Sequence, residues 1–455
     1  MSKTTDLTRG KVSSVILGFF FPMLFTNMLQ QIYNIADTAI VGKGLGDNSL
    51  AAVGNMGSVC FLIFGFAMGL SNGFSVIIAQ HFGAKDGQGL RRSIAASVKL
   101  SGAIAAVLTV LSVVFMRDIL VIMHTDGSII NESLRYGYIV FGGLAATIAY
   151  NLCGGILRAL GDSRTPFKAI IISSAMNITL DTLFIFVLKT GVEGAAAATV
   201  FSQLVSASIC YRKLRSIELI RLSREDFAQC GTFYDILIKN GLPMALMNSI
   251  TAIGCIVVQY FVNGMGVAYT SAYSACSKYV NLFMNPASTA GYTMSSYTSQ
   301  NYGAKNYERI RSGLRVCITI AAVSYVILGS LMVFFPRMLA GLMLNGEKPI
   351  ALAAEFLPIT GIMLFAVDFL FVFRNGVQGM GFPTVPMLSG IFEMVMRVAV
   401  IVSLTGTFGF RTTAFAEVAA WLGALLINMT AFRYYLGKKL RTEEPVRAKL
   451  LTQKL

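Results

Sequence analysis

Charged residues are scarce in this chain of 455 residues. Asp, Glu, Lys and Arg make up only 13% of it, whereas 55% of its residues are hydrophobic. A soluble globular domain carries about 25% charged residues, so these charges are too few to cover a soluble protein of this length. The apolar stretches are long and apolar all round, whereas barrel strands have about ten residues of alternating polarity. The composition therefore predicts an all-α membrane protein.

Histidine and cysteine are also rare, with two and seven residues, and no Cys-x-x-Cys pair occurs. We interpret the cysteines as small buried hydrophobic residues rather than as disulfides or metal ligands. The sequence has no nucleophile-and-base arrangement and no Gly-x-x-x-x-Gly-Lys-Ser/Thr phosphate loop. We therefore expect neither an enzyme nor an ATP-driven pump, and no cofactor. Na⁺ is the one metal expected, if it serves as a coupling ion.

Twelve stretches reach the length of about 20 apolar residues that a membrane-spanning helix needs. They are residues 12–40, 51–80, 93–116, 135–157, 167–189, 193–212, 240–264, 272–299, 312–335, 355–378, 386–406 and 411–433. Most Lys and Arg residues lie before the first stretch, in the even-numbered gaps and in the tail. This positive-inside bias places both termini in the cytoplasm and accounts for the net charge of +15 without nucleic acid. We expect a multi-pass protein of the cytoplasmic membrane whose first stretch is retained rather than cleaved as a signal peptide.

The two halves of the chain repeat each other. The segments Gln-His-Phe-Gly-Ala-Lys at 80–85 and Gln-Asn-Tyr-Gly-Ala-Lys at 300–305 correspond, and Gly161 and Pro166 match Gly381 and Pro386. Each half has six spans, so the halves share one orientation and form two six-helix lobes related by a pseudo-two-fold axis along the membrane normal. The predicted parts are an N-terminal lobe at 1–212, a cytoplasmic basic linker at 213–239, a C-terminal lobe at 240–435 and a basic tail at 436–455.

Carboxylates within spans are costly and therefore indicate function. Asp37 lies in span 1 and Asp181 in span 5. Tyr33 and Asn177 each precede one of these acids by four residues and share its helix face, and Thr199 in span 6 could add a hydroxyl. Such a pocket suits Na⁺, or a proton on one of two mutually repelling carboxylates. A static polar network that fixes helix packing is the alternative.

The C-terminal half does not repeat these acids, because Val258 and Ile401 align with Asp37 and Asp181. Its own candidates lie in spans 8, 10 and 11; they are Lys278, Asp368, Glu393 and Arg397. Glu393 and Arg397 are four residues apart in the favourable order and predict a helical ion pair. Lys278 and Asp368 either pair across helices or line a cleft. Pro286, in the middle of span 8, predicts a kink that could act as a hinge.

Several of these motifs resemble the multidrug and toxic compound extrusion (MATE) family. The resemblance covers the whole chain and is carried by Ile-Tyr-Asn-Ile-Ala-Asp-Thr-Ala-Ile-Val-Gly at 32–42, the two Gly-Ala-Lys segments, Leu-Arg-Ala-Leu-Gly-Asp-Ser-Arg-Thr-Pro at 157–166 and Asn-Ile-Thr-Leu-Asp at 177–181. It implies a V-shaped pair of six-helix lobes that exports small organic, often cationic compounds by antiport with inward H⁺ or Na⁺.

The resemblance also implies a cation site in the N-terminal lobe, made by Tyr33, Asp37, Asn177, Asp181 and Thr199. Some members use further acids in the C-terminal lobe, but the span-7 position here is Gln259. We expect a monomer whose partners are small organic substrates and membrane lipids. A lipid-linked oligosaccharide flippase of the same superfamily is the alternative. It is disfavoured because it needs a strongly cationic cleft, and we find few basic residues within the spans.

Overall fold

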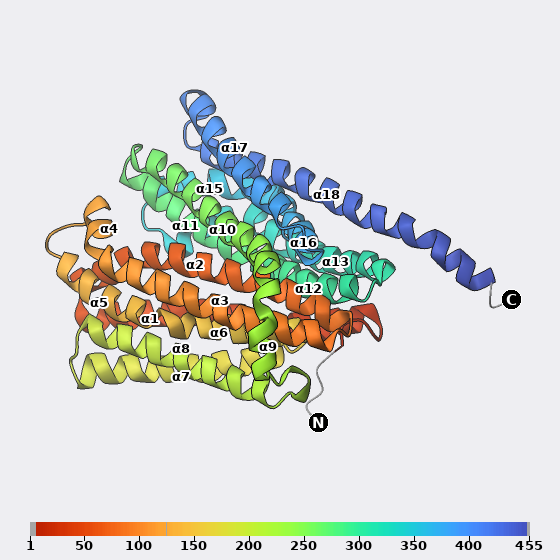
Figure 1. Ribbon diagram of the computed structural model, residues 1–455. Coiled ribbons are helices and arrows are strands. Elements are labelled where there is room, and N and C mark those ends of the chain that lie inside the picture. The colour runs from red at the N-terminus through yellow and green to blue at the C-terminus, as the bar shows by residue number, and fades with distance from the viewer. Residues whose placement is uncertain (1–5, 124, 453–455) are drawn as a thin grey trace. The chain divides into compact units, whose positions relative to one another are not determined.

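The structure is a computed structural model that describes residues 6–123 and 125–452. Within these residues the chain is helical and contains no strand. The helices form two compact units (Figure 1). One unit holds Phe21–Ala245, and the other holds Leu7–Phe20 together with Leu246–Leu455. Two helices, α1 (Val12–Leu45) and α10 (Tyr234–Asn263), begin in one unit and continue into the other.

The first unit is built mainly of long helices that lie side by side (Figure 1). Besides its parts of α1 and α10, it contains α2 (Asp47–Gly83), α3 (Gly87–Val114), α4 (Met116–Ile122), α5 (Ile130–Gly142), α6 (Leu144–Ala159), α7 (Arg164–Thr182), η1 (Leu183–Val187), α8 (Val192–Arg215), η2 (Glu218–Ile220), α9 (Arg224–Gln229) and η3 (Cys230–Phe233).

The second unit repeats this order of long and broken helices. It contains α11 (Val267–Phe283), α12 (Asn285–Gly303), α13 (Tyr307–Phe334), α14 (Pro336–Met343), α15 (Glu347–Ile362), α16 (Leu364–Gly379), α17 (Thr384–Phe408) and α18 (Arg411–Thr452). In this unit α17 packs against α18, and α12 packs against α16.

Each of the twelve predicted spans coincides with one helix or one broken pair of helices. Among the described residues, nine helices are long and apolar enough to cross a membrane, or eleven spans if each of two bent pairs counts as one. The pairs are α5 with α6, bent by 44°, and α15 with α16, bent by 48°. The remaining segment joins α11 to α12, and α12 is rich in Ser, Thr, Gln and Asn. Helices satisfy their own backbone hydrogen bonds, as the bilayer core requires.

The break predicted in span 8 occurs at Met284, between α11 and α12. Pro286 stands in the first turn of α12. Its missing N–H would otherwise donate to a carbonyl of the preceding helix, which explains why the helix ends here. Proline in a first helical turn is well tolerated.

The glycines shared by the two halves end equivalent helices. Gly161 follows α6 with φ 84°, and Gly381 follows α16 with φ 88°. This left-handed conformation lets the chain turn back on the last helical carbonyls: the N–H of Gly161 donates to Arg158 and that of Gly381 to Gln378. Lys85 and Lys305, at the ends of α2 and α12, both have φ 57°. The sequence repeat is therefore a repeat of backbone conformation.

The N-terminal segment before α1 packs within the second unit. The Leu7 N–H donates to the Gln300 side chain at 2.9 Å, and the Asn301 amide donates to the Leu7 carbonyl at 3.3 Å. Arg309 Nη1 donates to the Gly10 carbonyl at 3.0 Å. Leu7–Phe20 thus belongs with the second unit rather than with the N-terminal lobe predicted at 1–212.

The predicted linker at 213–239 packs against the first unit. Its short helix α9 and the turn η3 lie against α3 (Figure 1). Lys99 Nζ of α3 donates to the Phe227 carbonyl at 2.8 Å, Arg92 contacts Gln229, and Arg91 Nε lies 3.5 Å from Asp226 Oδ2. The division between the units falls later than predicted, within α10 at Ala245.

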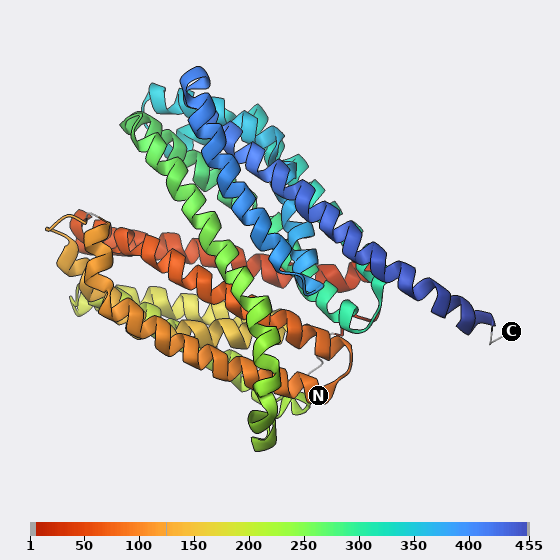
Figure 2. The ribbon, with the colours of Figure 1, turned by 45° about the horizontal axis from the view of Figure 1, so that its top comes forward.

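Residues 436–452 of the predicted tail at 436–455 are continuous with span 12, and residues 453–455 lie outside the described part of the chain. Helix α18 runs without interruption to Thr452 and continues well past the other helices of its unit (Figure 2).

At the corner between α2 and α3, Asp86 caps α3. Its carboxylate accepts from the Gly89 N–H and lies 2.9 Å from His81 Nδ1. These two interactions hold the pKa of the Asp86 carboxyl below its usual range.

Helices α2 and α10 cross at small residues within the first unit. A Cβ on Gly69 would lie 2.6 Å from the Ala245 Cα, and one on Gly73 would lie 2.4 Å from the Gly241 Cα. Each helix presents two small residues four apart, a spacing that brings membrane helices into close contact. We infer that this crossing fixes the start of α10 against the first unit.

Gly73→Ala is expected to destabilise the protein, because a methyl group cannot enter this backbone contact without parting the helices. Overpacking of this kind costs about 1–3 kcal/mol. Gly65→Ala on the same helix is the matched control, since a Cβ there meets nothing within 4 Å, and alanine is the better helix former. Thermal unfolding in detergent should show a lower Tm for Gly73→Ala alone. Equal Tm values for the two variants would mean that the crossing tolerates a side chain.

Candidate functional site

The predicted N-lobe residues come together inside the first unit. Asp37 on α1 and Asp181 on α7 lie close enough for the charge of Asp37 to act on Asp181. Tyr33, one turn before Asp37, lies beside Thr199 of α8 and near both carboxylates. Asn177 lies one turn before Asp181, and both are fully buried. The structure thus gathers all five predicted residues at one place.

The polar atoms of this site have few protein partners. Within the described part of the chain, no hydrogen-bond partner occurs for the buried Asp37 Oδ1, both carboxylate oxygens of Asp181, or the amide oxygen and nitrogen of Asn177. Buried polar atoms are normally hydrogen-bonded, and exceptions require an explanation such as an ion or water. The Thr199 hydroxyl donates to the Ala195 carbonyl at 3.0 Å, so its oxygen lone pairs point to other partners. These oxygen atoms could together ligate a small hard cation.

The backbone next to this site departs from a regular α-helix at the end of α7. Immediately after Asp181 the helix widens into the π-turn η1, a feature frequent at functional sites. Gly44 near the end of α1 packs directly on this turn: a Cβ there would lie 2.4 Å from Ile185 Cγ2. The contact holds α1 against the end of α7, and so keeps Asp37 opposite Asp181.

Tyr136 of α5 was not predicted but belongs to the same site. Its side chain is buried and lies within electrostatic range of Asp37, Asp181 and Tyr33. Nothing in the local sequence distinguishes Tyr136 from the other tyrosines of the spans. Only the packing of α5 in the first unit identifies it.

The second unit holds a buried cluster of four charges from three helices. Arg374 of α16 pairs with Glu393 of α17. Arg397 of α17 reaches Glu393 at 3.8 Å, but its shorter contacts are to Glu417 of α18, at 3.0 Å from Nη2 and 3.1 Å from Nε. All four side chains are at most 12% exposed. We call these four residues the C-lobe ion-pair cluster.

This cluster contains the predicted helical ion pair of Glu393 with Arg397. The two residues do lie near each other, but each has a closer partner, Arg374 and Glu417 respectively, that the sequence analysis left out. Both partners are charged residues inside apolar spans, the same signal that identified the others. The prediction that the spans contain few basic residues was therefore incomplete. Each of these two arginines is paired with a carboxylate.

Asp368 and Lys278 do not pair. Asp368 of α16 is fully buried, and neither of its oxygens has a hydrogen-bond partner in the described residues. Lys278 of α11 is exposed, and no ion pair joins it to Asp368. Of the two arrangements that the sequence allowed, cross-helix pairing is excluded within this unit.

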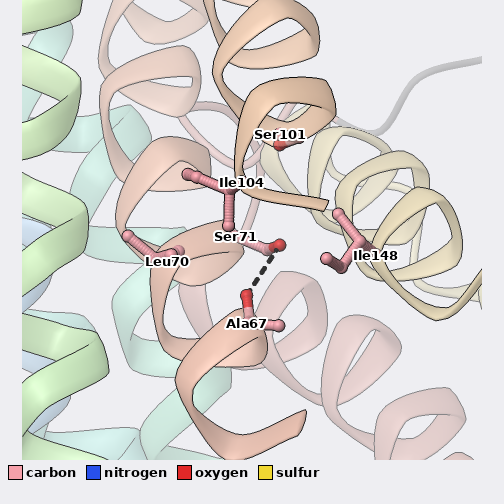
Figure 3. A pocket seen from close by; sticks show the side chains of 6 residues that line it. All are labelled: Ala67, Leu70, Ser71, Ser101, Ile104 and Ile148. Carbon is pink, nitrogen blue, oxygen red and sulfur yellow. Dashed lines mark hydrogen bonds between the residues drawn. The ribbon is translucent and has the colours of Figure 1, made fainter. Parts of the chain in front are cut away.

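A gap in the first unit, lined by Ala67, Leu70, Ser71, Ser101, Ile104 and Ile148, is not a binding site (Figure 3). It lies between α2, α3 and α6 and is mostly apolar. The Ser71 hydroxyl, drawn in Figure 3, donates to the Ala67 carbonyl of its own helix at 3.0 Å. The side chains leave no room there for a ligand.

These features define a multi-pass helical membrane protein whose two halves repeat each other and bury different charged groups. Residues 22–183 and 243–402 match the family model MatE. The chain therefore belongs to the MatE family and is a membrane transporter of the prokaryotic MATE type, with twelve spans in two six-helix lobes.

Related sequences and a solved structure agree with this assignment. The chain is 28% identical to the probable multidrug resistance protein YoeA of Bacillus subtilis over 353 residues, which cover 75% of this chain and 76% of YoeA. It is 25% identical to the probable multidrug resistance protein YpnP of the same organism, covering 95% of this chain and 97% of YpnP. A solved MATE structure in the bent conformation matches with a TM-score of 0.91 over 97% of this chain and 99% of its own, at 24% identity.

Proposed function

We propose that this protein is a secondary active exporter of small organic compounds, often cationic or amphipathic. It works by alternating access and is driven by antiport of H⁺ or Na⁺ moving inward. The N-lobe site of Tyr33, Asp37, Asn177, Asp181 and Thr199 binds the coupling ion, and Tyr136 completes it.

The main support is the pair of carboxylates of Asp37 and Asp181, because three of their four oxygens have no hydrogen-bond partner among the described residues. Two carboxylates in one low-dielectric space repel each other and lose their hydration. A bound proton or Na⁺ relieves both costs. A static polar network would instead satisfy its own members by hydrogen bonds, and the orphaned atoms of Asp37, Asn177 and Asp181 argue against that alternative.

The names of related proteins support the substrate class. YoeA and YpnP are probable multidrug resistance proteins, and MepA of Staphylococcus aureus, 24% identical over 442 residues, is a multidrug export protein. We further propose that the protein acts as a monomer in the cytoplasmic membrane, with both termini in the cytoplasm. It needs no cofactor, performs no enzymatic reaction and binds no nucleic acid. Asp368 and Pro286 stay candidates for a second acid and a hinge.

Efflux of a fluorescent cationic dye from proteoliposomes tests the proposal. A pH gradient and a Na⁺ gradient are imposed separately on the purified wild-type chain. Dye movement that follows one gradient and stops when that gradient is collapsed is the expected result, and it identifies the ion. Folded protein that moves no dye under either gradient would contradict ion-coupled drug export and favour the flippase alternative.

A further inference from the structure

The internal repeat allows the two lobes to be compared residue by residue. The pattern of buried and exposed side chains is identical in residues 171–180 of α7 and 391–400 of α17, and in residues 133–137 of α5 and 353–357 of α15. It is also identical in 194–198 of α8 and 412–416 of α18, and again in 206–210 and 424–428. In α1 and α10 the internal prolines correspond, and so do the fully buried Val41 and Val262. Each position of the N-lobe site therefore has a definite counterpart in the second unit.

The counterparts differ in chemistry from the N-lobe residues. They are Gly254 for Tyr33, Val258 for Asp37, Phe356 for Tyr136, Arg397 for Asn177, Ile401 for Asp181 and Glu417 for Thr199. Both carboxylates of the N-lobe site have become apolar. A cationic side chain stands where the amide stood, and a carboxylate stands where the threonine hydroxyl stood.

The Arg397 guanidinium lies inside this counterpart site. Its Nη2 and Nε contact Glu417 at 3.0 and 3.1 Å. Its Nη1 lies against α10 at Gly254, where an added Cβ would be 3.2 Å away. The missing side chain at Gly254, the counterpart of Tyr33, is what makes room for the guanidinium. Arg397 is 3% exposed, and its Nη1 has no hydrogen-bond partner in the described residues.

We propose that the second lobe contains a monovalent-cation site that the chain fills permanently with its own guanidinium. Arg397 is the tethered cation, and Glu417 is its carboxylate. In the first lobe the corresponding place is lined by carboxylates and takes a cation from solution. Only the first lobe therefore exchanges ions during transport. This inference rests on the proposed N-lobe cation site. The experiment that tests the inference measures binding and involves no transport.

Removal of the tethered cation should open the site to a free one. In Arg397→Ala, Glu417 keeps its charge while Glu393 keeps its partner Arg374. Methylguanidinium, which has the shape and charge of the lost group, is the probe. Millimolar methylguanidinium chloride should raise the Tm of the full-length variant in detergent by about 1 °C for each kcal/mol of binding, the scale expected for a chain of this length. The wild type should not respond, because its site is filled.

Arg411→Ala is the matched control. It also removes an arginine paired with a glutamate, Glu355 at 3.1 Å, but both side chains are largely exposed. Methylguanidinium chloride should change the Tm of this control variant no more than it changes the Tm of the wild type. A shift in Arg397→Ala no larger than in wild type and control would overturn the proposal and leave Arg397 a packing residue.

A second variant covers the case in which Arg397→Ala does not fold. Arg397→Gln keeps a polar chain that can donate to Glu417 but lacks the charge, and the same Tm response is expected of it. If methylguanidinium raises the Tm of neither variant above the wild-type response, the proposal is wrong. Failure of the proposed export would look different, because wild-type liposomes would then show no gradient-driven efflux whatever methylguanidinium does.

Discussion

Asp37→Asn is expected to abolish gradient-driven export while leaving the protein folded. The amide keeps the size of the side chain but can neither carry a proton nor supply a charged ligand to Na⁺. Asp37 faces Asp181 across the N-lobe site, so its loss removes one of the two carboxylates that bind the ion. Dye efflux from proteoliposomes should fall at least about tenfold, equivalent to about 1.4 kcal/mol of lost coupling.

Asp235→Asn provides the control, since Asp235 is 73% exposed and its ion pair is with Lys239 of its own helix. This variant should export dye at the wild-type rate. Asp181→Asn should lose the dependence of efflux on the ion gradient. Wild-type drug resistance in cells carrying Asp37→Asn would refute the coupling role, and unchanged ion dependence in Asp181→Asn would remove Asp181 from the site.

The N-lobe site could be predicted because its signals are local. Asp37 and Asp181 are isolated charges in apolar spans, and each has a polar residue one turn earlier on the same face. The twelve spans could be located for a similar reason, since bilayer thickness fixes their length. That the faces of α1 and α7 meet required the family resemblance or the structure.

The parts that the sequence did not predict depend on packing between distant segments. Tyr136 joins the ion site only through the position of α5. The docking of Leu7 on Gln300 and Asn301 joins residues nearly three hundred positions apart, and no pattern near Leu7 indicates it. The basic composition of the linker does not indicate where it packs, whereas Lys99 and Arg92 of α3 provide specific partners for its backbone and side chains.

Arg374 and Glu417 were missed for a different reason. Their signal is present in the sequence, but Glu393 and Arg397 appeared to satisfy each other as a helical pair. A distance of 3.8 Å within that pair, beside a closer Arg374 contact and a 3.0 Å contact to Glu417, shows why spacing alone is insufficient. An i, i+4 pair on a surface helix contributes only about 0.3–0.5 kcal/mol. Buried charges therefore find stronger partners on neighbouring helices.

The energetics of this cluster give the second large expected effect. Glu393→Leu leaves the Arg374 side chain, 7% exposed, without its carboxylate. Breaking a buried ion pair by removing one partner costs about 3–5 kcal/mol, so the Tm of this chain in detergent should fall by roughly 3–5 °C. Arg374→Met should be similarly harmful, because Glu393 then keeps only the 3.8 Å contact with Arg397.

The double variant Arg374→Met with Glu393→Leu should be more stable than either single variant. It removes both charges together and leaves the neutral pair of Arg397 and Glu417 intact. Replacing a whole buried pair by apolar residues of similar size is often nearly neutral. Arg135 and Glu193, an exposed pair at 3.3 Å in the first unit, serve as control. Their removal should change the Tm little, since exposed pairs contribute about 0–1 kcal/mol.

The double-mutant cycle distinguishes two roles for the C-lobe cluster. A coupling free energy of several kcal/mol between positions 374 and 393 would mean that they stabilise α16 against α17 as a pair. Additive losses would mean that each residue packs independently and that its charge is incidental. If the double variant recovers stability and still exports dye, Arg374 and Glu393 only hold the helices together. If the double variant recovers stability but not export, Arg374 and Glu393 have a second role. They then also keep Arg397 directed toward Glu417 in the filled site of the second lobe.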